Sequence, residues 1–223
     1  MSGIFRIALS ACVLIVMSSP TARSEPACDS GGWLLWFSDI HFDPFGGGQV
    51  SKLANASQTG WRDHSEWGAI LKRIPANRSC SPAGRDANDG LLQMVLRRAA
   101  SPSQPRPNAI LITGDFLAHD FNATYFNTQQ LPARLATVTQ FNRFVDQTLA
   151  YVALSVSQKF PGVPVIAALG NNDAYCGDYG IRSDSGFLST TRRTFQKYFL
   201  PDLSEDFVTY GGCYASIVPG THH

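Results

Sequence analysis

The sequence has few charged residues and no cluster of basic ones. Charged residues make up 16% of its 223 residues, and the formal net charge is +1. Because binding of a nucleic-acid backbone needs a basic patch or run, no nucleic-acid surface is evident. Internal repeats and low-complexity tracts are also absent, which argues against a repeat architecture. With 44% hydrophobic residues, the chain is long enough for one domain with a sizeable core.

No apolar run is long enough to span a bilayer comfortably. The N-terminal run Ile7–Met17 has about 11 residues, follows Arg6, and is followed by small residues ending in Ala22-Arg23-Ser24. This order predicts a signal peptide over residues 1–24, with a membrane anchor as the alternative. The mature chain, residues 25–223, is then expected to be secreted or periplasmic and to have no transmembrane span.

Cysteine pairs of the C-x-x-C type are also missing, which disfavours a zinc site built on thiolates. Cys12 would leave with the signal peptide. Export would permit disulfides among the even number of cysteines that remain, in any of three pairings between which the spacing does not choose. These disulfide candidates are Cys28, Cys80, Cys176 and Cys213.

What the sequence does contain is an alternation of strand and helix patterns. Short apolar runs predict buried strands over residues 33–38, 109–113 and 163–169. Helical apolar periodicity predicts helices over residues 86–100, 133–159 and 187–199, and residues 214–218 are a candidate start of a fourth strand. This order predicts an α/β fold with a largely parallel sheet flanked by helices.

Residues 43–85 interrupt this alternation. They are rich in Gly, Pro, Asn and Ser, which predicts a long irregular insertion with a short helix near 64–73. The insertion carries the aromatic residues Phe45, Trp61 and Trp67. These side chains either contact a ligand or pack the insertion, and a secreted binding module that uses them is one interpretation of the chain.

Polar residues follow directly after the three predicted strands. The tips are Asp39-x-His41, Gly114-Asp115 and Gly170-Asn171-Asn172-Asp173. Ligands bind beyond the carboxyl ends of strands in open α/β sheets, so we expect these tips to converge. Such a cluster is costly unless a positive charge neutralises it, and its oxygen and nitrogen donors suit Zn, Mn or Fe. Two such metal ions, bridged by Asp115, can activate a water for phosphoryl displacement.

The segments "SDIHFDP", "ITGDFLAHD" and "ALGNND" together resemble the calcineurin-like metallophosphoesterase family. The closer resemblance is to its exported branch of acid sphingomyelinase-like phosphodiesterases and endopolyphosphatases, and "GNND" is more similar to the latter. The resemblance implies a layered metallophosphoesterase-type sheet flanked by helices. It also implies an exported enzyme that uses hydroxide activated by two divalent metal ions. The substrate would be a small phosphorylated molecule or polyphosphate, with a phosphodiester, phosphomonoester or phosphoanhydride bond.

The resemblance also implies roles for individual residues. Asp39 and His41 would bind the first metal ion, Asp115 would bridge, and Asn171 would bind the second ion through its amide oxygen. His119 and Asp120 would lie near the substrate or behind the metal ligands. Asp43 would either brace His41 or turn the chain before Pro44.

Two departures from the family pattern lead to further expectations. Asn172, a catalytic candidate together with His119, stands where many members have a histidine that assists the leaving group. Its amide can donate a hydrogen bond to a phosphate oxygen but is no general acid near neutral pH. Either the leaving group needs no help, as in a phosphoanhydride, or His119 substitutes. The family's late G-H-x-H motif is missing, and His222 and His223 are not assigned to it. The alternative is therefore a truncated, catalytically inactive fragment that binds at most one metal ion.

Overall fold

The computed structural model describes residues 32–58, 65–74, 80–81, 84–128, 131–177, 179–182 and 186–216. The predicted signal peptide over residues 1–24, Cys28, Trp61 and residues 217–223 lie outside these ranges. In the described part of the chain, no helix combines the length and the apolar character that crossing a membrane requires.

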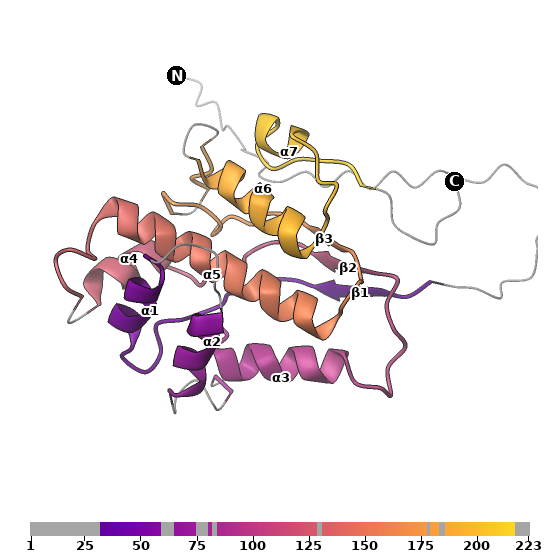
Figure 1. The fold of residues 1–223 in the computed structure, drawn as a ribbon, viewed down its shortest axis with the longest axis horizontal. Helices are drawn as coiled ribbons and strands as arrows, with labels where there is room; N and C mark the ends of the chain where they lie inside the picture. The colour runs from indigo at the N-terminus through magenta and orange to yellow at the C-terminus, as the bar shows by residue number, and fades with distance from the viewer. Residues whose placement is uncertain are drawn as a thin grey trace, which may run out of the picture.

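A parallel sheet of three strands carries the candidate site. Its strands are β1 (Leu34–Phe37), β2 (Ala109–Ile112) and β3 (Val165–Ala167), in the spatial order β1-β2-β3. In register, Leu35 pairs with Ile110 and Ile110 pairs with Val165. The three expected strands and their parallel arrangement are confirmed, but the expected burial of the first strand is wrong, since Leu34 and Trp36 of β1 are exposed. Because all strands run in the same direction, their carboxyl ends meet at one edge of the sheet (Figure 1).

Three longer helices cover the sheet, and the middle one, α5, contacts the other two (Figure 1). They are α3 (Asp89–Ala99), α5 (Val138–Lys159) and α6 (Phe187–Tyr198), all within the predicted ranges. Helix α5 begins later than the predicted range 133–159, because Thr137 caps it by accepting a hydrogen bond from the Gln140 N–H at 3.2 Å. The short helices α4 (Phe121–Asn127) and α7 (Asp206–Thr209) were not expected.

The prediction of an irregular insertion over residues 43–85 is wrong for residues 50–56. This segment forms helix α1 (Val50–Ala56), which contacts α2 (Ser65–Lys72), the short helix expected near 64–73. Helix α1 is too short to be stable by propensity alone, so its packing on α2 and α5 stabilises it.

The aromatic residues of this region pack into the core. Trp67 has no exposed surface, and its indole N–H donates to the Leu53 carbonyl oxygen at 3.2 Å. Phe45 and Trp67 both pack against Phe144 of α5, with ring centroids 5.7 and 5.1 Å away. Of the two roles considered for these aromatics, Phe45 and Trp67 therefore have the packing role.

Candidate metal centre

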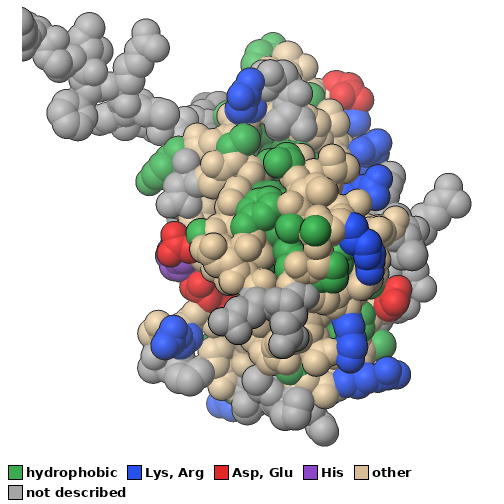
Figure 2. Space-filling view, turned by 90° about the vertical axis from the view of Figure 1, so that its left-hand side faces the viewer, with side chains coloured by type: hydrophobic (Ala, Val, Ile, Leu, Met, Phe, Trp, Pro, Cys, Tyr) green, Lys and Arg blue, Asp and Glu red, His purple; other side chains and the backbone are tan. Residues whose placement is uncertain are grey.

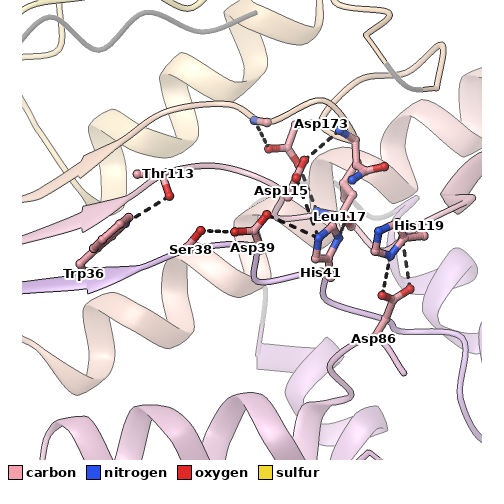
Figure 3. Close-up of polar contacts among 12 residues, drawn as sticks. Trp36, Ser38, Asp39, His41, Asp86, Thr113, Asp115, Leu117, His119 and Asp173 are labelled. Atoms are coloured by element: carbon pink, nitrogen blue, oxygen red, sulfur yellow. Dashed lines mark hydrogen bonds and ion pairs between the residues drawn. The ribbon is translucent and has the colours of Figure 1, made fainter. Parts of the chain in front are cut away.

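Two of the three strand tips bring metal-ligating atoms together (Figure 3). Asp39 and His41 follow β1, and Asp115 follows β2. The His41 Nε2 atom lies 3.9 Å from Asp39 Oδ1 and 3.9 Å from Asp115 Oδ2. One ligand atom from each of the three residues lies within 4.8 Å of the others. The convergence that the sequence predicted is therefore present for these residues.

The backbone at all three residues is in the left-handed region. Their φ angles are 51° at Asp39, 43° at His41 and 51° at Asp115, where only a few per cent of non-glycine residues lie. Such strain costs about 1–3 kcal/mol per residue and persists only where neighbouring structure enforces it. Here the His41 N–H donates to the Asp115 carbonyl oxygen at 2.7 Å, joining the two loops directly. The strained turns thus aim three side chains at one place.

A backbone carbonyl orients the imidazole of His41. The Nδ1 atom lies 3.2 Å from the Leu117 carbonyl oxygen, which can only accept a hydrogen bond. Nδ1 must therefore carry the hydrogen, which leaves the Nε2 lone pair directed toward Asp39 and Asp115. Metal-binding histidines are commonly held in this way by a carbonyl on the second ring nitrogen.

Close packing of the loops that follow β2 and β3 holds the Asp115 carboxylate in place. The Asn172 N–H donates to Asp115 Oδ1 at 2.9 Å, while Oδ2 faces His41. A Cβ atom at Gly170 would lie 2.1 Å from Asp115 Oδ1, and one at Gly114, where φ is +105°, would lie 2.4 Å from the Gly170 nitrogen. Both positions therefore require glycine.

The third tip contacts Asp115 through the backbone N–H of Asn172. Asn171 is half-buried, and its carbonyl oxygen accepts a hydrogen bond from the Tyr179 N–H at 2.8 Å. Asn172 is only 5% exposed. Asp173 is fully buried and accepts hydrogen bonds from the Gly170 and Leu117 N–H groups at 2.8 and 3.0 Å. Burial raises the pKa of Asp173 to about 7. Sequence reasoning assigned Asp173 no role, although it ties the loops after β2 and β3 together.

The structure places His119 beside His41. The two rings stack with centroids 4.0 Å apart and an angle of 15° between their planes. Asp86 contacts the edge of the His119 ring, with Oδ1 2.8 Å from Nδ1, and this hydrogen bond raises the pKa of His119. Asp86 follows no strand and belongs to no motif, so nothing in the sequence pointed to it.

The two remaining acidic candidates, Asp43 and Asp120, differ in their local contacts. Asp43 Oδ1 accepts a hydrogen bond from the Phe45 N–H at 2.7 Å, which turns the chain at Pro44. Burial raises the pKa of Asp43. Asp120 is exposed, has a φ of 49°, and precedes helix α4 without a hydrogen bond from its side chain to the helix N-terminus.

The cysteine candidates do not gather at this centre. Cys80 and Cys176 are exposed free thiols, and Cys213 is half-buried. Cys28 lies outside the described residues. The disulfide stays a prediction.

Charge is unevenly distributed on the face toward which the carboxyl ends of the strands point. Figure 2 shows acidic side chains next to a histidine at one margin of this face and a band of lysine and arginine along the opposite margin. Two carboxylates and one imidazole in contact form a donor set that suits a divalent ion such as Zn, Mn or Fe. The residues at the strand tips thus fit a metal ion by their chemistry as well as by their placement.

Comparison with known proteins agrees with this description. Residues 32–220 match the family described as calcineurin-like phosphoesterase. The chain therefore belongs to the calcineurin-like phosphoesterase family. It is 25% identical over 205 residues to sphingomyelin phosphodiesterase A of Dictyostelium discoideum. The match covers 90% of this chain and 30% of that protein, so the chain spans less than a third of the relative's length.

Proposed function

We propose that this protein is an exported metal-dependent phosphoesterase that hydrolyses a phosphodiester. The observation that carries the proposal is the contact of Asp39, His41 and Asp115 at the carboxyl ends of β1 and β2. Family membership supports a phosphoesterase, and similarity to a sphingomyelin phosphodiesterase supports a phosphodiester among the three bond types considered. Phosphomonoesters and the phosphoanhydrides of polyphosphate are the substrates to compare with it.

The metal would be held by side chains that follow the three strands. Asp39, His41 and Asp115 would bind the first ion, and Asp115 together with the Asn171 side-chain amide would bind a second. A divalent ion at this place polarises a phosphoryl oxygen and lowers the pKa of water. The protein's own contribution is to orient: the Leu117 carbonyl directs the His41 ring, and the Asn172 N–H directs the Asp115 carboxylate.

The first test measures metal content and activity on the same samples. The full chain is loaded with Mn²⁺ or Zn²⁺, bound metal is counted per chain, and four substrates are assayed. They are bis-p-nitrophenyl phosphate, p-nitrophenyl phosphate, polyphosphate and sphingomyelin. Asp115→Ala is expected to lose bound metal and turnover together, whereas the matched control Asp202→Ala, at an exposed position, is expected to keep both.

The outcomes distinguish an active two-metal phosphoesterase from a catalytically inactive chain. About two bound ions with turnover that depends on Asp115 supports the two-metal enzyme. At most one bound ion and no turnover on any substrate would contradict the proposal and favour the inactive form that the sequence also suggested. Export is tested separately, by determining the N-terminal residue of the protein secreted from a host that processes signal peptides.

A further inference from the structure

Asp86 contacts His119 at two points. Its Oδ1 atom lies 2.8 Å from the ring Nδ1 of His119, and its Oδ2 atom accepts a hydrogen bond from the His119 backbone N–H at 3.1 Å (Figure 3). A carboxylate that accepts from both the ring and the backbone fixes the ring relative to its own main chain. The Nδ1 of His119 is thus occupied, and Nε2 is the ring nitrogen left to meet a ligand.

Hydrogen bonds between the neighbouring residue and the loop after β1 fix the position of Asp86. Its neighbour Ala87 donates to the His41 carbonyl oxygen at 2.9 Å and accepts from the Asp43 N–H at 2.8 Å. The Phe42 N–H donates to the Phe116 carbonyl oxygen at 2.9 Å, which joins the loop after β1 to the loop that leads to His119. Asp86 therefore reaches His119 from a segment that is hydrogen-bonded to the His41 loop.

Accessibility distinguishes the two side chains expected to assist the reaction. Asn172 is 5% exposed, and its backbone N–H is hydrogen-bonded to Asp115. The side chain of His119 is 62% exposed while its ring stacks at 4.0 Å on His41. A molecule bound beside Asp39, His41 and Asp115 can therefore reach His119, whereas Asn172 is covered by protein.

We propose that Asp86 is a positioning residue that holds His119 as the side chain that contacts the substrate's phosphoryl group beside the metal centre. The proposal rests on the proposed phosphoesterase function and adds a residue that no motif contains. In it, the His119 ring is protonated on both nitrogens: Nδ1–H donates to Asp86, and Nε2–H donates to the phosphoryl group the hydrogen bond that Asn172 is too buried to supply. Asp86 acts only through His119 and binds neither metal nor substrate.

A double-mutant cycle in the full chain tests this proposal, using Asp86→Ala, His119→Ala and the double variant, with Asp202→Ala as the matched control. The first readout is the ¹⁵N shift of the His119 ring nitrogens in metal-free protein, which reports the hydrogen bond that Nδ1–H donates to Asp86. The second is the affinity of the Mn²⁺-loaded protein for inorganic phosphate. The third is the pair kcat and KM for bis-p-nitrophenyl phosphate.

The expected pattern is specific to positioning. Asp86→Ala changes the His119 ring shift, lowers kcat about 10- to 100-fold, and weakens phosphate binding, as His119→Ala also does. The two substitutions are non-additive, so Asp86→Ala has no further effect in the His119→Ala background. Binding of Mn²⁺ itself is unchanged by Asp86→Ala.

Other outcomes overturn the proposal or separate it from the proposed function. Additive effects, or wild-type kcat in Asp86→Ala, would show that Asp86 does not act through His119. Loss of Mn²⁺ binding in Asp86→Ala would make Asp86 a metal ligand, since Asp86, His41 and His119 also lie within 4.8 Å of one another. If the wild-type chain lacks turnover, the phosphoesterase proposal fails, and the cycle measured on phosphate affinity still decides the role of Asp86.

Discussion

Gly170 packs against the carboxylate of Asp115 so closely that a Cβ atom would lie 2.1 Å from Oδ1. Gly170→Ala must therefore displace the carboxylate or the loop after β3. We expect metal affinity to fall at least about tenfold, because Asp115 then no longer faces His41 correctly. Titration of the metal-free chain with Mn²⁺ by calorimetry measures this change.

Gly68→Ala in helix α2 is the matched control for Gly170→Ala. A Cβ atom there would lie 3.6 Å from Tyr151 Cε2, an ordinary contact, and alanine favours helix over glycine by up to about 1 kcal/mol. We expect unchanged metal affinity and equal or higher stability. Equal metal affinity in both variants would show that the close approach at Gly170 does not position Asp115.

Asp173→Ala is expected to destabilise the protein strongly. The substitution leaves the N–H groups of Gly170 and Leu117 without their acceptor in a buried place, at a cost of about 1–3 kcal/mol each. Urea unfolding measures the change, with Asp202→Ala as the exposed carboxylate control. A loss of stability no larger than in the control would contradict the structural role assigned to Asp173.

The buried carboxyl group of Asp146 should make the free energy of unfolding depend on pH. Burial raises the pKa of Asp146 to about 7 from its ordinary value of 3.8, and the Tyr175 hydroxyl donates to its Oδ1 at 2.6 Å. Between these two pH values the unfolded chain releases the proton before the folded one does, so this group's contribution lowers stability as pH rises.

Asp146→Asn keeps an oxygen for the Tyr175 hydroxyl but cannot ionise. The gain in unfolding free energy of Asp146→Asn over the wild type should therefore be small near pH 4, grow as pH rises, and level off above about pH 7. Urea unfolding of both proteins across this range gives the difference. A constant difference across the range would mean that Asp146 does not titrate abnormally in the folded state.

Trp67 and Trp36 should respond very differently to truncation. Trp67 has no exposed surface, whereas Trp36 is 66% exposed. Trp67→Ala is expected to lower the free energy of unfolding by about 3–5 kcal/mol, and Trp36→Ala by much less. Below the unfolding transition, Trp67→Ala should retain the wild-type kcat per folded molecule. A selective loss of kcat would instead restore the substrate-contact interpretation of this aromatic residue.

The strands and long helices could be predicted from the sequence because their cause is local. The apolar runs at 33–38, 109–113 and 163–169 have the length of strands, and the helical stripes between them favour parallel crossovers. The exposure of Leu34 and Trp36 in β1 could not be predicted, because it depends on which elements cover that run. Helix α1 could not be predicted, since seven residues with mixed polarity become helical only through the neighbours that cover them.

For the candidate metal centre, too, some features follow from the sequence and others only from the tertiary structure. By itself, the sequence determined that Asp39, His41 and Asp115 follow strands that end at one edge of a sheet, since parallel strands leave no other arrangement. Only the tertiary structure decided that Asp86 holds His119, that Asn172 is covered and that Asp173 joins two loops. These relationships join segments 33 to 56 residues apart in the chain, through hydrogen bonds that no local pattern encodes.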